Sequence, residues 1–247
     1  MNSTIQTILN HQSIRNYADK AIDDGDLMDI IKCAQAEPNS INGQQFSVIV
    51  VKDAQIKSKL AALCGDQDYI AKAPVFLIFV ADYHKLLLAA KKNEKPMEIV
   101  TDVEALLVSS VDIGIALGNS IAAAESIGLG VVPIGGVRQN PEEIIKLLNL
   151  PQLVFPISGL CLGYPAENPG QKPRLPINTF MHLETYHPDM ESFIDEYDDV
   201  VSEYMSARTG GQSRRNWSKS VSGIYKSVYY PKVTPTLKQQ GFLKHDD

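Results

Sequence analysis

The longest apolar segment of the chain runs from Asp102 to Gly128 and has apolar residues on nearly every helical face. It contains no proline, and small residues such as Gly114 and Gly118 separate the large ones. A helix that is apolar all round is buried on all sides, and small residues let neighbouring backbones approach closely. The pattern therefore predicts a central core helix. It leaves open whether one subunit covers this helix or whether a second subunit also contributes.

A membrane span is a rival interpretation of the same segment. Asp112 and Asn119 interrupt the apolar run, which leaves it short of the roughly 20 predominantly apolar residues that a bilayer requires. We therefore expect no membrane association.

Four other apolar runs have the length of strands, and helical patterns alternate with them. The run over residues 75–81 is nearly continuous, which is typical of a strand covered on both faces. Hairpin signals are few, so the order predicts an α+β or α/β sandwich. The predicted strands span residues 46–51, 75–81, 131–136 and 156–162, and the predicted helices span 3–10, a segment from 22 onward, 53–63 and 141–148.

The character of the chain changes beyond about Pro188, where polar helical patterns surround a break at residues 209–212 and a basic cluster. This part has little apolar content of its own. We expect residues 1–187 to form the main domain and residues 188–247 to form an appended helical arm.

Composition and charge argue against several classes of function and location. The 247 residues carry a net charge of −6, which argues against general affinity for nucleic acid. Three cysteines without metal-type spacing are compatible with a reducing compartment, and we expect no metal site. The first residues have no basic segment followed by an apolar one, so no signal peptide is predicted and a cytoplasmic location is expected.

No standard catalytic template fits the chain, which lacks G-x-S-x-G, P-loop and H-E-x-x-H patterns. The segment 128–133 imitates a dinucleotide fingerprint but lacks its third glycine and lies between a helix and a strand, the reverse of the required order. What remains is a set of side chains in two clusters that could bind an anion. A phosphate binds tightly where several such groups converge, because each charge-assisted hydrogen bond is short and strong. The first cluster holds His11, Ser13 and Arg15, and the second holds Lys172 and Arg174 at alternate positions of an extended segment. The alternative is that Arg15 pairs with Asp19 or Asp23 and that the second cluster is solvated.

Several short motifs follow one another in a familiar order: 11–15 (HQSIR), 39–40 (NS), 67–69 (QDY), 134–136 (IGG), 159–163 (GLCLG) and 172–176 (KPRLP). Over essentially its whole length the chain resembles the flavin-dependent nitroreductase family. Within that family it is similar to bacterial NADPH-dependent, oxygen-insensitive nitroreductases and flavin reductases with a long C-terminal arm. The resemblance implies an α+β fold with an antiparallel or mixed sheet flanked by helices. It also implies a homodimer with the central helix at the interface and one FMN per active site.

The resemblance also implies roles for individual residues. His11, Ser13, Lys172 and Arg174 would hold the FMN phosphate, and Arg15 would lie at the N1/O2 edge of the ring. Ribityl and ring polar atoms would be contacted by Asn39, Ser40, Gln67 and Tyr69, and the ring would lie against Pro133, Ile134 and Gly135. No side chain is needed as a catalytic acid or base, because the cofactor carries the hydride chemistry. The chain departs from the commoner His-Arg-Ser pattern at Gln12.

In relatives with such an arm, an arginine recognises the 2′-phosphate of NADPH. The matching residue is Arg208, with Arg214 and Arg215 close behind it; the alternative is an exposed helix with solvated cations. The resemblance thus implies an FMN-dependent NADPH oxidoreductase that reduces nitroaromatics, quinones or free flavins in a two-electron ping-pong cycle. The alternatives are a flavin carrier or sensor, and a dehalogenase or flavin-fragmenting enzyme. The basic arm argues against these, since none of them needs a site for the phosphate of NADPH.

Overall fold

A four-stranded antiparallel sheet organises the first part of the fold, and the computed structural model describes residues 2–244. The strands lie in the order β1-β2-β4-β3, and each pairs antiparallel with its neighbour. The four predicted strands and the α+β class are therefore confirmed. The strands are β1 (Phe46–Val51), β2 (Val75–Asp82), β3 (Gly130–Ile134) and β4 (Val154–Gly163).

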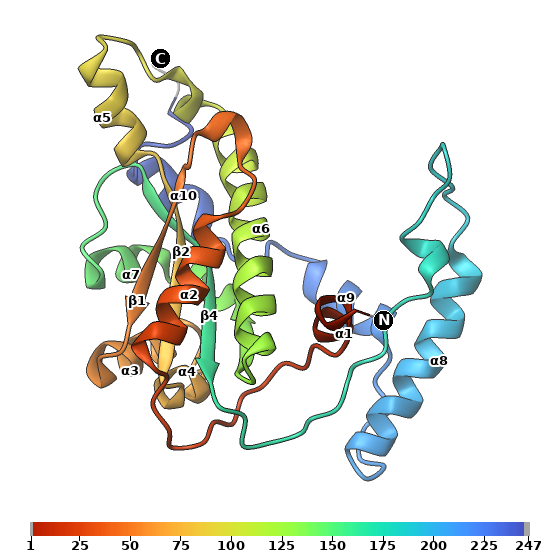
Figure 1. Cartoon of the computed structure of the whole chain (residues 1–247). Helices are drawn as coiled ribbons and strands as arrows, with labels where there is room; N and C mark the ends of the chain where they lie inside the picture. Colours follow the sequence, from red (N-terminus) through yellow and green to blue (C-terminus); the bar gives the residue numbers. More distant parts are fainter. Residues whose placement is uncertain (1, 245–247) are drawn as a thin grey trace. The chain divides into compact units, whose positions relative to one another are not determined.

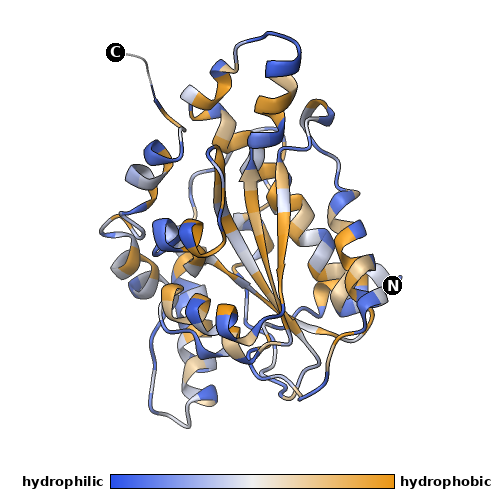
Figure 2. Ribbon diagram, turned by 90° about the vertical axis from the view of Figure 1, so that its left-hand side faces the viewer, coloured by the Kyte–Doolittle hydropathy of each residue, from blue (hydrophilic) through white to orange (hydrophobic). Residues whose placement is uncertain are grey.

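Helices cover both faces of the sheet (Figure 1). Side chains alternate between the faces of a strand, and on β2 Leu77 and Phe79 pack with α2 (Asp24–Gln35) and α6 (Glu104–Ser126). Phe76 and Ile78 pack in the cluster on the opposite face. That cluster involves α3 (Ala54–Leu63), α4 (Asp68–Lys72) and α7 (Pro141–Leu147). Double coverage explains why the strands are apolar along most of their length, as their orange colour in Figure 2 shows.

Two helices lie in segments for which the pattern predicted no element, α4 and α5 (His84–Lys92), whereas α10 (Val233–Gln239) lies in the part of the chain where polar helices were predicted. By contrast, α1 (Ser3–Leu9), α2, α3, α6 and α7 are confirmed. α2 is capped at its N-terminus by Asp23, whose carboxylate accepts a hydrogen bond from the Gly25 N–H at 2.7 Å. β3 ends at Ile134, two residues before the end of the predicted run, and the glycines that follow begin a short 3₁₀ helix. The 3₁₀ turns are η1 (Ser40–Asn42), η2 (Glu98–Thr101), η3 (Gly135–Arg138) and η4 (Ile177–Thr179).

The described residues divide into two compact units: unit 1 holds residues 2–169 and 230–244, and unit 2 holds residues 170–229. Residues 230–244 belong to the core of unit 1, where Leu237 and Phe242 pack with Tyr83 and Phe155. Unit 2 contains α8 (Glu191–Arg208) and α9 (Trp217–Tyr225), and Asp198 of α8 accepts a hydrogen bond from the Ser218 N–H at 2.8 Å. The role of residues 188–247 as an arm for NADPH and dimer contacts stays a prediction.

The central helix α6 is buried on one face only. Asp112, Ile113 and Ala116 are buried, whereas Leu107 and Val111 are 55% and 60% exposed. By length and composition α6 could cross a membrane. Its inner face, however, packs against α2 and the sheet and carries a hydrogen-bonded carboxylate, so α6 is a core helix of unit 1. All-round burial was predicted, and within one protomer this is wrong, because Leu107 and Val111 remain exposed among residues 2–244.

Candidate functional site

An extended segment, residues 11–18, crosses one end of the sheet and carries the first cluster. Ser13 forms a parallel bridge to Val131 of β3, and the Ile14 N–H donates to the Val131 carbonyl at 2.9 Å. Tyr17 forms an antiparallel bridge to Pro165 on the other side. Because side chains alternate along an extended chain, positions 11, 13 and 15 share one face of the segment.

His11 is held by a carboxylate that the sequence analysis did not identify. Its Nδ1 lies 2.6 Å from Oε1 of Glu125, near the C-terminal end of α6, and its Nε2 lies 3.4 Å from the Ser13 hydroxyl. Burial raises the pKa of Glu125, although the hydrogen bonds from His11 and from the Gln12 backbone oppose this shift. With Nδ1 engaged by Glu125, the ring orientation is set and Nε2 faces Ser13.

Arg15 lies among polar groups from a different part of the sequence. Its guanidinium carbon is 5.6 Å from the centroid of the Tyr69 ring, within cation–π range. The Tyr69 hydroxyl donates to the Gln67 side chain, whose amide in turn donates to the Cys64 carbonyl. Among the described residues Arg15 makes no ion pair with Asp19 or Asp23, so the alternative suggested by the sequence is not observed.

Glu167 fixes the backbone that carries Arg15. Its Oε1 accepts hydrogen bonds from the N–H groups of Arg15 and Asn16, at 2.7 and 3.0 Å. The guanidinium is therefore left to other contacts, since the carboxylate binds the backbone rather than the side chain. Neither Glu125 nor Glu167 belongs to a recognisable motif, and each meets its partner more than 100 residues away in the sequence.

The end of β3 offers exposed backbone beside these side chains. β3 is an edge strand, Pro133 is exposed and Gly135 is half-buried, whereas Ile134 is buried. A Cβ added to Gly136 would lie 2.6 Å from Nε2 of Gln67, so the turn packs directly against the Gln67 side chain. The structure thus brings eight predicted residues together: His11, Ser13, Arg15, Gln67, Tyr69, Pro133, Ile134 and Gly135.

Asn39 and Ser40 lie at the opposite end of the sheet. The loop that carries them leads into β1, where Phe46 pairs with Ala81, whereas Ser13 lies beside the end of the sheet that contains Val75. Six residues of strand separate Val75 from Ala81, or about 20 Å at 3.3 Å per residue. One protomer therefore does not bring Asn39 and Ser40 to the His11 cluster.

The other predicted cations all belong to unit 2. Lys172 and Arg174 are exposed, and the Arg174 guanidinium donates to the Lys172 carbonyl at 3.3 Å. Arg208 is the last residue of α8, is exposed and donates to the Tyr204 hydroxyl at 2.6 Å. Arg214 and Arg215 are exposed in the segment between α8 and α9.

This arrangement favours ligand binding over side-chain catalysis. Within residues 2–244 there is no group of three His, Cys, Asp or Glu residues that could hold a metal. Burial raises the pKa of the Cys64 thiol to about 12, so this cysteine is not a nucleophile at neutral pH. A cation, an imidazole and a hydroxyl beside accessible strand backbone suit a planar ligand that carries a phosphate.

Comparison with known proteins agrees with this geometry. Residues 8–164 match the sequence profile of the nitroreductase family, and residues 172–245 match that of its C-terminal domain. The chain belongs to the nitroreductase family. The resemblance drawn from the motifs is thereby confirmed.

Similar proteins extend over the full length of the chain. FMN reductase (NAD(P)H) of Bacillus subtilis is 47% identical over 245 residues, which cover 98% of each chain. Oxygen-insensitive NADPH nitroreductase of Salmonella typhimurium is 35% identical and aligns over 98% of this chain and 99% of its own. The solved structure of B. megaterium NfrA2 is 48% identical, covers 100% of both chains and superposes with a TM-score of 0.97.

Proposed function

We propose that this nitroreductase-family protein is an FMN-dependent NADPH oxidoreductase that reduces nitroaromatics, quinones or free flavins. The observation that carries the proposal is the convergence of His11, Ser13 and Arg15 with Gln67 and Tyr69 beside the exposed end of β3. Full-length similarity to FMN reductases and to an NADPH nitroreductase supports it. FMN would accept a hydride from NADPH and pass the electrons on, so the protein has to bind and orient it.

The residues present fit FMN. In this proposal His11 and Ser13 bind the phosphate, with Lys172 and Arg174 of unit 2 as further cationic contacts. Arg15 lies at the N1/O2 edge of the ring, where a fixed cation stabilises the negative charge of reduced flavin. Gln67 and Tyr69 take ring and ribityl polar atoms, and Pro133, Ile134 and Gly135 provide the backbone against which the ring lies.

We further propose a homodimer whose interface contains α6. Leu107 and Val111 leave an apolar face of this helix uncovered, and apolar surface of this kind marks an interaction site. Asp112, which binds the Asn39–Ser40 loop, and Glu125, which binds His11, are 13 residues apart on α6, about 20 Å at 1.5 Å per residue. If two copies of α6 pack antiparallel about a two-fold axis, the loop of one copy approaches the His11 cluster of the other. Such a dimer completes the flavin site with Asn39 and Ser40 of a second copy.

In the same proposal Arg208 binds the 2′-phosphate of NADPH, with Arg214 or Arg215 as a second contact. The planar guanidinium group can donate two hydrogen bonds to the oxygens of one phosphate. The partners are then NADPH, small-molecule electron acceptors and a second copy of the chain. We place the protein in the cytoplasm, since its three cysteines are unpaired.

The proposed function is tested by purification and turnover. Purified protein should be yellow with near-stoichiometric FMN and should oxidise NADPH with a panel of nitroaromatic, quinone and flavin acceptors. K172A/R174A should retain FMN much less well, since charge-assisted hydrogen bonds contribute roughly 1.5–3 kcal/mol each. K91A/K92A removes the same charge from two exposed residues of α5 and should leave FMN content unchanged. Equal FMN loss in both variants would show a non-specific charge effect and refute the assigned phosphate contacts.

A further inference from the structure

The loop between α2 and β1 adopts a costly backbone conformation. Ile41, Asn42 and Gln44 all have positive φ angles, of 49°, 55° and 51°. For a β-branched residue such as Ile41 this is an unfavourable conformation, and its side chain is 95% exposed and provides no burial in return. Strain of this kind persists only where surrounding contacts impose it.

Asp112 on α6 supplies contacts at both ends of this loop. The Gln45 side-chain amide donates to Oδ2 of Asp112. Burial raises the pKa of this carboxyl, and the backbone N–H of Ser40 and the Gln45 amide both act on it in the opposite direction. Gln45 and Asp112 are 2% and 3% exposed, so both groups are removed from water. Hydrogen bonds to a buried carboxylate are stronger than neutral ones. A single side chain in the middle of α6 therefore bridges the ends of the segment Ser40–Gln45.

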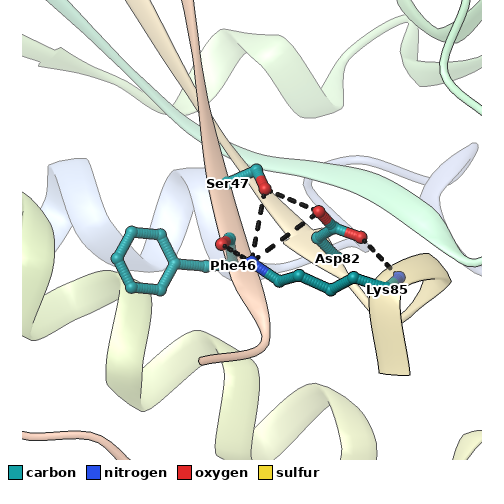
Figure 3. A network of polar contacts seen from close by, with 4 residues as sticks. All are labelled: Phe46, Ser47, Asp82 and Lys85. Carbon is teal, nitrogen blue, oxygen red and sulfur yellow. Dashed lines mark hydrogen bonds and ion pairs between the residues drawn. The ribbon is translucent and has the colours of Figure 1, made fainter. Parts of the chain in front are cut away.

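A second set of contacts fixes the start of β1 without involving Asp112. The Asp82 N–H donates to the Gln45 carbonyl at 2.9 Å, and the Ser47 hydroxyl donates to the Asp82 carboxylate at 2.5 Å. Lys85 donates to the Phe46 carbonyl at 2.7 Å (Figure 3). The start of β1 is thus held independently of Asp112. Within the loop, the Gly43 N–H also donates to the Ser40 carbonyl at 2.8 Å and the Gln44 N–H to Oδ1 of Asn39 at 3.3 Å, so Asp112 supplies the contact from outside the loop.

The neighbouring buried carboxylate has no such role. Glu37 is 4% exposed, and among the described residues neither of its carboxylate oxygens has a hydrogen-bond partner. It is therefore a comparison for Asp112: a buried acid next to the same loop, whose contact with the loop is made by its backbone carbonyl, which accepts a hydrogen bond from the Asn39 side chain at 3.3 Å.

We propose that Asp112 is a positioning residue for FMN, acting through its hydrogen bonds to Ser40 and Gln45, which keep the loop in the conformation that presents Asn39 and Ser40 to the flavin. The inference rests on the proposed function, because that is what places Asn39 and Ser40 at FMN. Asp112 itself does not touch the cofactor. Its effect is to pre-order a strained loop before binding, which improves affinity by reducing the ordering cost that binding would otherwise carry.

The test is titration of the apoprotein with FMN, followed by quenching of flavin fluorescence, at a concentration where light scattering gives all variants the same mass. D112N keeps the side-chain volume but replaces one carboxylate oxygen, a hydrogen-bond acceptor, with an NH₂ group, which is a donor. This variant should raise the Kd for FMN roughly tenfold or more. D112N/Q45E reverses donor and acceptor, so the new amide donates to the new carboxylate, and affinity should recover. Hydrogen exchange in the peptide 36–45 should be faster in D112N and return towards the wild-type rate in the double variant.

Two controls separate positioning from general destabilisation. S109A removes a buried hydroxyl that donates to the Ala105 carbonyl, one turn from Asp112, and has no contact with the loop. E37Q neutralises the neighbouring acid and keeps the backbone carbonyl that accepts from Asn39. Both variants should bind FMN as the wild type does. G43A leaves Asp112 intact, but its Cβ would overlap with Oε1 of Gln45 and displace the same amide, so it should weaken FMN binding even if D112N fails to fold.

The possible outcomes are distinct. Wild-type affinity in D112N or in G43A would overturn the inference. So would a loss in D112N that D112N/Q45E does not recover, because Asp112 would then act through α6 rather than through the loop. Failure of the wild-type apoprotein to bind FMN would instead refute the proposed function.

Discussion

Gly114 and Gly118 on α6 provide a sharp test of the proposed dimer. Each glycine lowers helix stability by about 0.8–1.0 kcal/mol relative to alanine. Within the protomer neither has a steric reason to be glycine, because a Cβ added at either position meets no atom within 4 Å. If α6 contacts a second copy, the reason lies in that contact, where glycine permits close approach of two backbones.

The substitution G118L separates the two explanations. In an isolated protomer the leucine side chain would project into open space and α6 would gain helix propensity. In a two-fold dimer the same side chain would be overpacked twice. At about 1–3 kcal/mol per site, this amounts to roughly 2–6 kcal/mol, or about 30-fold to 20,000-fold in the dimer dissociation constant.

Sedimentation velocity over a range of protein concentrations measures this constant directly. The wild type should sediment as a species of twice 27.2 kDa at micromolar concentration, and G118L should shift towards the protomer while retaining its circular dichroism spectrum. G223A on α9 is the matched control, because Gly223 is also helical with no atom within 4 Å of an added Cβ. A G118L protein that remains a wild-type dimer would refute the placement of α6 in the interface.

Three other predictions follow from charge and burial. Burial, followed by the charge of Asp112, raises the pKa of Glu37 in the folded state. The charged form of Glu37 therefore destabilises the fold at neutral pH, so E37Q should raise Tm at pH 7. This gain in Tm should shrink as the pH falls towards the pKa that Glu37 has in the unfolded chain. An equal gain at pH 7 and at low pH would contradict this. R208A should weaken NADPH binding by about 10- to 150-fold and leave NADH nearly unaffected, and kcat/KM values that fall equally for both nucleotides would exclude Arg208 as the reader of the 2′-phosphate. Cys64 and Cys161 are buried and Cys33 is exposed. A disulfide reagent should therefore modify one thiol per folded chain and all three thiols after denaturation. Rapid modification of all three thiols in the folded chain would contradict the burial of Cys64 and Cys161.

The sheet was predictable because its strands bury both faces and so leave an apolar run that needs no alternation. The segment at residues 75–81 is the clearest case, and it became β2 with a fully apolar interior. The helices α4 and α5 were not predicted. α4 has only five residues and α5 has no buried residue, so neither carries an apolar stripe long enough to detect.

The candidate site was predictable only in part. His11, Arg15 and Tyr69 could be named as candidates because their motifs resemble those of a known family. Glu125 and Glu167 could not, since each contacts the 11–16 segment from more than 100 residues away and belongs to no local pattern. Composition likewise gave no sign that α6 would be half uncovered in one protomer, since an all-round apolar helix has the same sequence whether one chain or two chains bury it.

The most direct test of the proposed function is the pair of half-reactions, followed anaerobically by flavin absorbance near 450 nm in the purified holoenzyme. The proposal predicts that NADPH bleaches the flavin band with an equimolar loss of NADPH. After removal of excess nucleotide, a nitroaromatic or quinone acceptor should restore the band. A protein that binds FMN but is not bleached by NADPH or NADH, or whose reduced flavin no acceptor reoxidises, would contradict the assignment as an oxidoreductase and favour a flavin carrier or sensor.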